Sequence, residues 1–214
     1  MILKPKDRED WLSMRHKGIG GSDAGAVLGV NKYRSNVDLW NEKTGRVIPD
    51  DISCKPAVIF GKKSEKHLRE LFKLDYPQYK VNYHEFYMYV NDEYPFIFAT
   101  LDGEITDDNG KHGILEIKTT TIQNSSQWEE WEDKIPDSYY AQVLHQLIAT
   151  GWDFAILKAY IRYYRDNSLR AAIRHFKINR KDVQSDVDYL IEKEKAFWEC
   201  VEKDVKPALI LPEI

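Results

Sequence analysis

Two carboxylates and a lysine stand in neighbouring segments that are otherwise apolar and β-branched. Glu116 and Lys118 interrupt the stretch GILEIKTTT, residues 113–121, and Asp102 precedes Gly103 in the segment before it. Successive side chains of a strand point to opposite faces, so Glu116 and Lys118 share one face and the intervening apolar side chains share the other. The spacing therefore predicts a strand with one charged face and one buried face.

The turn between these two segments predicts which side chains lie opposite each other. A three-residue loop at 108–110, with glycine in the left-handed conformation, would place Glu104 across from Ile114. The same register places Asp102 across from Glu116, with Cβ atoms about 5 Å apart. A bulge at the glycine would shift this register by one residue. Because facing carboxylates repel each other, the hairpin predicts a divalent cation held by hard oxygen ligands.

A third carboxylate comes from the predicted helix over residues 59–74. Glu65 is three residues before Leu68, so it lies along the apolar stripe of that helix. A single glutamate in this position most often pairs at the surface, here with Lys62 or Arg69. Together with the two carboxylates of the hairpin, we expect it to contribute to the metal site.

This combination of acids with Lys118 suits the hydrolysis of phosphodiesters. Carboxylates hold Mg²⁺, which neutralises the phosphate and lowers the pKa of a bound water, while an ammonium group orients the nucleophile or stabilises developing charge. A Glu-x-Lys triplet alone is weak evidence, since strand edges often carry a solvated pair of this kind. The apolar strand around it, together with Asp102 and Glu65, gives it a chemical meaning.

A glycine-rich segment, RHKGIGGSDAG at residues 15–25, suggests a phosphate site. It lacks the G-x-G-x-x-G spacing and the G-K-[ST] triplet of nucleotide-binding loops. Arg15 and the hydroxyl of Ser22, at the start of a following helix, could bind one phosphate. A plain turn with Ser22 as the helix N-cap explains the same residues equally well.

Two glutamines, Gln142 and Gln146, lie one turn apart at the margin of a predicted helix. Their amides can bond catalytic groups or DNA. Glutamines in such places more often form an ordinary polar boundary, so the pair alone decides nothing.

The elements that must position these residues follow from apolar spacing and turn residues. A first helix is predicted after the cap Asp7, with further helices over 23–28, 35–44, 59–74, 138–150 and 180–203, and strands over 83–90, 96–105, 113–120, 154–164 and 169–178. This order predicts an α/β fold with a mixed sheet of about five strands flanked by helices. We expect one domain over 1–214, with its motifs within about 11–178.

The charge balance excludes an overall basic protein. The chain of 214 residues has 31 Lys and Arg against 35 Asp and Glu, a net charge of -4, and so lacks the signature of many nucleic-acid binders. Local clusters at 15–17 and 62–66 can still bind phosphates.

Cofactors held by cysteine and insertion into a membrane are not expected. Cys54 and Cys200 have no C-x-x-C spacing, which argues against a disulfide framework or a cysteine-bound metal. No run of about 18 apolar residues could span a bilayer, and the first residues are charged, unlike a signal peptide. We expect a cytoplasmic protein.

Five short segments follow one another along the chain. They are WLSMRHKGIGGS at 11–22, FGKKSE at 60–65, LDG at 101–103, LEIK at 115–118 and YAQVLHQ at 140–146. In this order they resemble the phage-type recombination exonucleases, the YqaJ and lambda exonuclease family within the PD-(D/E)xK nucleases. The resemblance covers roughly 11–151 and implies a restriction-endonuclease-like core. Leu101 departs from the proline in the motif's name.

The resemblance implies an activity and its partners. It points to a Mg²⁺-dependent exonuclease, with Mn²⁺ as a substitute, that degrades the 5′-ended strand of linear double-stranded DNA. The resulting 3′ overhang would serve a single-strand annealing protein in phage-type recombination, in a bacterial or phage-infected cell. Family members can form a trimeric ring around DNA, which implies a homo-oligomer.

The resemblance also implies a role for each residue of the motifs. The metal ligands would be Asp102, Glu116, the backbone carbonyl of Ile117, and Glu65 as a further acid. Lys118 would be the catalytic lysine and Gln142 the motif glutamine. The residues on the side of the DNA and its 5′ phosphate would be Arg15, Ser22 and Gln146.

Two other functions fit the same residues. A DNA endonuclease on this scaffold would use the same acids and lysine without holding a strand end. A DNA-end-binding protein with a decayed nuclease site is the other alternative, and the presence of Asp102, Glu116 and Lys118 together argues against it.

Overall fold

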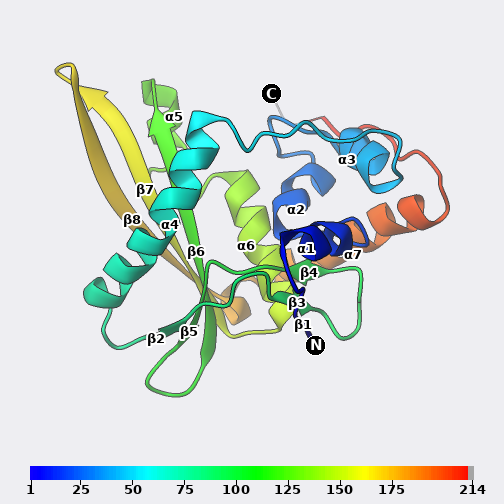
Figure 1. Ribbon diagram of the computed structural model, residues 1–214, viewed down its shortest axis with the longest axis horizontal. Helices are drawn as coiled ribbons and strands as arrows, with labels where there is room; N and C mark the ends of the chain where they lie inside the picture. The colour runs from blue at the N-terminus through cyan, green and yellow to red at the C-terminus, as the bar shows by residue number, and fades with distance from the viewer. Residues whose placement is uncertain (212–214) are drawn as a thin grey trace.

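A five-stranded mixed sheet lies on the left of Figure 1 in the computed structural model, which describes residues 1–211. In sheet order the strands are β2 (Lys80–Asn82), β5 (Gly103–Thr106), β6 (His112–Ile122), β7 (Phe154–Arg165) and β8 (Ser168–Asn179). Strands β6 and β7 are parallel, and the other neighbours are antiparallel. This arrangement confirms the predicted α/β class with a mixed sheet of about five strands.

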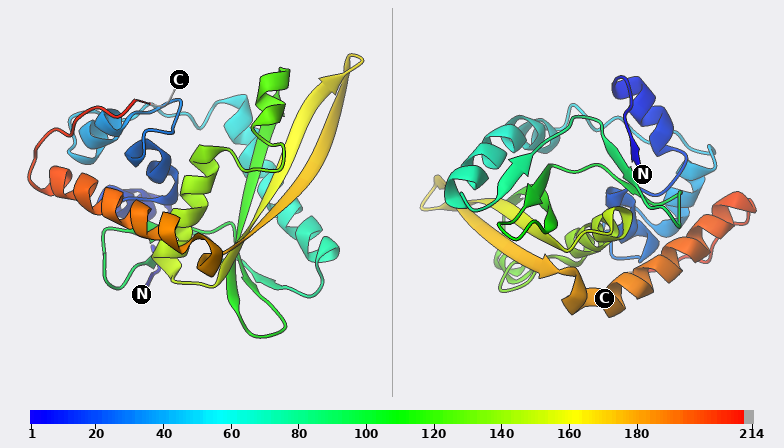
Figure 2. Two further views of the ribbon diagram at one scale, coloured as in Figure 1. Left: turned by 180° about the vertical axis from the view of Figure 1, so that it is seen from behind. Right: turned by 90° about the horizontal axis from the view of Figure 1, so that it is seen from below.

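One long helix covers each face of this sheet (Figure 2). Leu115 and Ile117 of β6 pack in the apolar cluster of α4 (Pro56–Asp75), whereas Ile114 packs in the cluster of α6 (Asp137–Thr150). Because strand side chains alternate between faces, Glu116 and Lys118 lie on the α6 face. The predicted division of this strand is confirmed, with Glu116 and Lys118 on one face beside Ile114, and Leu115 and Ile117 on the other.

The remaining elements lie mainly beside α6. A small sheet has the order β1-β3-β4, formed by Ile2–Leu3, Met88–Val90 and Phe98–Ala99. The shorter helices are α1 (Arg8–Arg15), α2 (Gly21–Val27), α3 (Asn36–Lys43) and α5 (Ser125–Glu129). After β8 the chain continues through the 3-10 turn η1 (Arg180–Val183) into the long helix α7 (Gln184–Glu202). Within residues 1–211, no helix is both long and apolar enough to cross a bilayer.

Two predicted strands are wrong as continuous elements. Residues 83–90 begin outside any strand and reach extended pairing only in β3, because Phe86 adopts a positive φ of 64° that interrupts the chain. Residues 96–105 contribute β4 to the small sheet and then β5 to the large one. The predicted helix over 180–203 is likewise divided, since η1 precedes α7.

A buried ion pair joins α6, α7 and β4. The Nδ1 atom of His145 lies 2.6 Å from Oε1 of Glu194, its Nε2 atom lies 2.8 Å from the carbonyl oxygen of Phe98, and neither charged side chain is exposed. Burial by itself would lower the pKa of His145, but the facing carboxylate raises it above its usual value. The protonated imidazole can therefore donate to both partners and fix the three elements together.

Candidate active site

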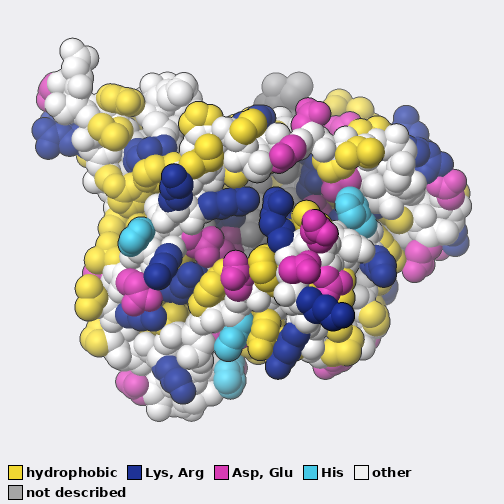
Figure 3. Space-filling view, in the orientation of Figure 1, with side chains coloured by type: hydrophobic (Ala, Val, Ile, Leu, Met, Phe, Trp, Pro, Cys, Tyr) yellow, Lys and Arg dark blue, Asp and Glu magenta, His cyan; other side chains and the backbone are white. Residues whose placement is uncertain are grey.

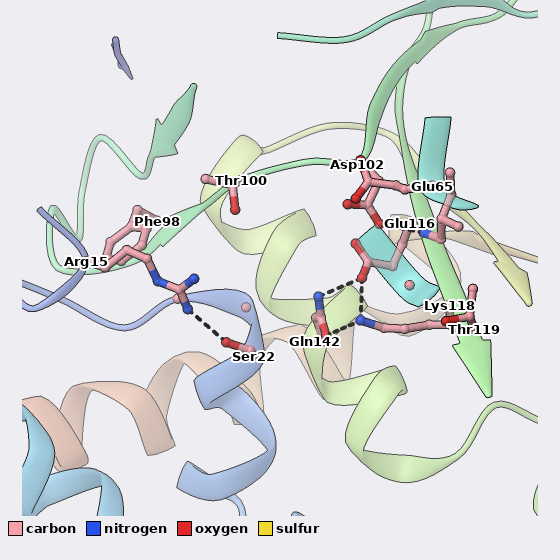
Figure 4. Close-up of a pocket in the computed structure, with 14 residues that line it drawn as sticks. Arg15, Ser22, Glu65, Phe98, Thr100, Asp102, Glu116, Lys118, Thr119 and Gln142 are labelled. Atoms are coloured by element: carbon pink, nitrogen blue, oxygen red, sulfur yellow. Dashed lines mark hydrogen bonds and ion pairs between the residues drawn. The ribbon is translucent and has the colours of Figure 1, made fainter. Parts of the chain in front are cut away.

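A cavity of about 260 Å³ opens beside β6, just before the first residue of β5 (Figures 3 and 4). Its walls come from β6, α4, α6, the segment before β5 and the start of α2. Eight of the nine residues predicted for the site line it: Arg15, Ser22, Glu65, Asp102, Glu116, Ile117, Lys118 and Gln142. The fold therefore brings together residues that are up to 127 positions apart, from 15 to 142.

The predicted register of the β5–β6 hairpin is confirmed. Glu104 pairs with Ile114, and the ladder ends at the pair of Gly103 with Leu115. Asp102 is one residue beyond, and its Oδ2 accepts a hydrogen bond of 2.8 Å from the backbone N–H of Ile117. Because the N–H and C=O of one strand residue point to the same side, the Ile117 carbonyl is also directed past the end of β5.

Hydrogen bonds from α6 hold Glu116 at both carboxylate oxygens. Gln142 Nε2 donates to Oε1 at 2.7 Å, and Gln146 Nε2 donates to Oε2 at 2.6 Å. Lys118 Nζ lies 2.7 Å from Oε1 of Glu116 and donates to Oε1 of Gln142 at 2.8 Å. Glu116 is only 2% exposed, so these contacts fix the orientation of its carboxylate.

The structure places Gln146 away from the cavity wall, where DNA was expected to contact it. This side chain is 1% exposed, does not line the cavity, and lies behind Glu116. The helical spacing of four residues places Gln142 and Gln146 on the same side of α6, so both amides reach one carboxylate. Gln146 therefore positions Glu116 and contacts no phosphate from this place.

Glu65 lies in the predicted metal site and also pairs with Arg69, the two alternatives that the sequence offered. It lines the cavity, and its Oε1 also pairs with Nη1 of Arg69 at 3.2 Å. Arg69 is 6% exposed, donates to the backbone carbonyl of Asp102, and stacks on the ring of Tyr83 at 3.7 Å. Sequence reasoning considered Arg69 only as a surface partner, whereas it joins α4 to the segment that carries Asp102.

The carboxylates of the cavity repel one another. The pKa of Asp102 is raised well above its usual value by burial and by the negative charges of Glu116 and Glu65. Burial also raises the pKa of Glu65. Burial opposes the charge of Lys118, but Glu116 and Asp102 raise its pKa and keep it an ammonium. Lys118 and Arg69, which pairs with Glu65, leave one negative charge in excess among these three acids, so a bound cation would stabilise the site.

The donor set fits a hard divalent cation. Carboxylates of Asp102, Glu116 and Glu65 line one cavity, and the Ile117 carbonyl adds a neutral oxygen. Such oxygen donors favour Mg²⁺ or Mn²⁺ over softer metals. Within residues 1–211 no three His, Cys, Asp or Glu side chains form a ready metal cage, since the Glu116 oxygens are directed to amides and to Lys118.

A cationic pocket occupies the other side of the cavity. Nη2 of Arg15 donates to Oγ of Ser22 at 3.0 Å (Figure 4). The Arg15 guanidinium also lies over the Trp11 ring, 4.6 Å from its centre. The predicted N-cap role of Ser22 is wrong, because the cap of α2 is Gly20, whose N–H donates to Asp23 at 3.0 Å. The Ser22 hydroxyl is consequently available to the cavity.

A buried charge network holds this pocket in place. Asp23 is 2% exposed and pairs with Arg34 at 2.5 Å and with Lys43 at 2.9 Å. Burial opposes its ionisation, but Lys43 and Arg34 hold the pKa of Asp23 well below its usual value. Sequence reasoning missed this network, and no local pattern marks partners 11 and 20 positions away.

Comparisons with known proteins extend this description. Residues 10–153 match the family model of the YqaJ-like viral recombinase domain. The uncharacterized protein YqaJ of Bacillus subtilis (strain 168) is 35% identical over 194 residues, which cover 89% of this chain and 55% of that protein. The chain thus spans about half the length of this curated relative.

Solved structures share the fold. The alkaline exonuclease LHK-Exo from Laribacter hongkongensis superposes with a TM-score of 0.68 at 19% identity, covering 92% of this chain and 94% of that one. LHK-Exo in complex with dAMP gives a TM-score of 0.66 at 18% identity, with the same coverage. At these identities the likeness shows the fold, and it agrees with the expected core.

Proposed function

The chain belongs to the YqaJ-like viral recombinase domain family, and from this membership and the cavity we propose that it is a metal-dependent 5′-to-3′ exonuclease on linear double-stranded DNA. The observation that carries the proposal is that one cavity contains both a set of acids with a lysine and a phosphate-binding pocket. Three carboxylates and Lys118 form one side, and Arg15 with Ser22 forms the other. The first set suits hydrolysis of a phosphodiester, and the second suits binding of a terminal phosphate.

Each side chain then has a chemical task. Asp102, Glu116, Glu65 and the Ile117 carbonyl would hold Mg²⁺, which neutralises phosphate charge and acidifies a bound water. The Lys118 ammonium orients the attacking water and stabilises the negative charge that develops on the phosphate. Gln142 holds both Lys118 and Glu116, at 2.8 and 2.7 Å, and so fixes their relative position.

The cationic pocket favours an exonuclease over an endonuclease. Arg15 presents a guanidinium whose geometry matches phosphate, and its stacking on Trp11 limits its movement. A 5′ phosphate held there would keep the strand end at a fixed distance from the carboxylates. The dAMP complex of LHK-Exo, a protein of the same fold, supports a site that accepts a deoxynucleoside monophosphate.

The proposal extends to the setting of the reaction. Removal of the 5′-ended strand would leave a 3′ overhang for a single-strand annealing protein in phage-type recombination. The family's description as a viral recombinase domain supports this role. On the resemblance alone, the proposal includes a homo-oligomeric ring around DNA in the cytoplasm of a bacterial or phage-infected cell.

Three duplex substrates test the proposal. With Mg²⁺ or Mn²⁺, linear DNA with 5′-phosphorylated or 5′-hydroxyl ends should be degraded while closed circular DNA stays intact, and EDTA should abolish the activity. The measurement is the release of mononucleotides over time. Cutting of the circle would identify an endonuclease instead, and no hydrolysis with either metal would indicate an end-binding protein.

Arg15 should control the preference for a phosphorylated end. Arg15→Ala is expected to lower kcat/KM on 5′-phosphorylated DNA by about 10- to 100-fold, since a charge-assisted hydrogen bond contributes about 1.5–3 kcal/mol. The rate on 5′-hydroxyl ends should change far less. Arg8→Ala, an exposed arginine on the same helix and outside the cavity, is the matched control. Equal losses on both kinds of end would refute the assigned role.

A further inference from the structure

Exposed lysines follow one flank of α4. Lys62 and Lys66 lie one helical turn apart, and both are exposed. At about 100° per residue, Lys62 lies about 20° and Lys66 about 60° from Arg69 around the helix, so both fall between the face that borders the cavity and the outer face of α4. Gly61 and Glu65 line the cavity itself, so the two lysines stand at its rim.

These lysines form no ion pair among the described residues, although the charges of Asp51 and Glu70 act at longer range on Lys62 and Lys66 respectively. The ion pairs within α4 join Arg69 to Glu65 and Lys73 to Glu70, and among the described residues none involves Lys62 or Lys66. Figure 3 shows Lys and Arg side chains around the central hollow of the molecule. In a chain of net charge -4, positive charge is thus available where a polyanion would approach the acids.

We propose that Lys62 and Lys66 form a track for the sugar-phosphate backbone of the duplex whose end enters the cavity. This inference rests on the proposed function. The two residues are about 6 Å apart along the helix axis, which matches about two nucleotides of one strand at 3.4 Å each. Lysine ammonium groups bind phosphates as point charges and read no base, as an enzyme acting on any sequence requires.

Lys63 provides a comparison within the same helix. It is also exposed and lies one turn before Lys66, but at about 160° from Glu65 around the helix it borders an apolar hollow together with Phe60 and His67. A general attraction of DNA to positive charge would use Lys63 as much as its neighbours. A track that leads to the cavity would use only Lys62 and Lys66.

The test measures binding separately from hydrolysis. Lys62→Ala, Lys66→Ala and the control Lys63→Ala are titrated with a 5′-phosphorylated duplex in EDTA at several salt concentrations. Each of the first two should weaken binding about eightfold at 0.1 M salt and reduce the slope of log K against log salt by about 0.9, whereas Lys63→Ala should leave both unchanged. Two unrelated duplex sequences should give the same losses. Alanine is the best helix former, so α4 should persist, as circular dichroism can verify.

The outcomes separate this inference from the proposed function. Equal effects of all three substitutions, or an unchanged slope in Lys62→Ala and Lys66→Ala, would overturn the track. If the track is overturned in this way but the wild-type protein still hydrolyses linear DNA, the proposed function stands and only the track is refuted. Wild-type protein that binds through these two lysines but never hydrolyses DNA would keep the track and lose the function.

Discussion

Replacing Glu116 with glutamine should reduce the hydrolysis of linear DNA on the order of 10⁴-fold. The substitution removes one of three carboxylates proposed to hold the metal. It also places an amide where Gln142, Gln146 and Lys118 all donate, so one buried donor would lose its acceptor. The rate is measured in single turnovers with saturating Mg²⁺.

A neighbouring glutamate provides the control for this change. Glu104→Gln alters a partly buried side chain on β5 that lies outside the cavity, and it should keep nearly full activity. Thermal unfolding of both variants distinguishes a damaged site from a damaged fold. Activity of Glu116→Gln within tenfold of the wild type would contradict the assignment of this carboxylate.

Replacing Lys118 with methionine should lower the single-turnover rate by about a thousandfold, because an ammonium that stabilises transition-state charge contributes that much. Methionine keeps the length of the side chain and removes the charge. Binding of duplex DNA in EDTA should change little, since the loss concerns the chemical step. Lys118→Arg should not restore the rate, because a planar guanidinium cannot occupy the position of a compact ammonium.

An exposed lysine of the same hairpin is the matched control. Lys111→Met lies in the turn before β6, away from the cavity, and should leave the rate unchanged. If Lys118→Met hydrolyses DNA at the rate of this control, Lys118 takes no part in the reaction.

The hairpin that carries the acids could be predicted from the sequence because its determinants are local. Gly110 adopts a φ of 77°, which a glycine accepts without strain, and this turn fixes every pairing up to Gly103 with Leu115. The next facing positions along the two strands are then Asp102 and Glu116. The helical repeat of α4 likewise placed Glu65 beside the cavity.

Contacts between distant segments could not be predicted in the same way. The pairs of His145 with Glu194 and of Asp23 with Lys43 join different helices, and no periodic pattern connects such partners. The strands before Gly103 were misjudged for a related reason. Aromatic and β-branched residues indicate extended chain but not which sheet it joins, and the positive φ of Phe86 is rare for a bulky residue.

The parallel pairing of β6 with β7 has a consequence for the timing of synthesis. Helix α6 lies between these strands in the chain, so β6 emerges from the ribosome before the helix that holds Glu116 and before its neighbouring strand. Parallel pairs close only after such a crossover, and long-range contacts form late in folding. A nascent chain that ends before α6 would therefore carry Asp102, Glu116 and Lys118 without the glutamine amides that orient Glu116 and Lys118.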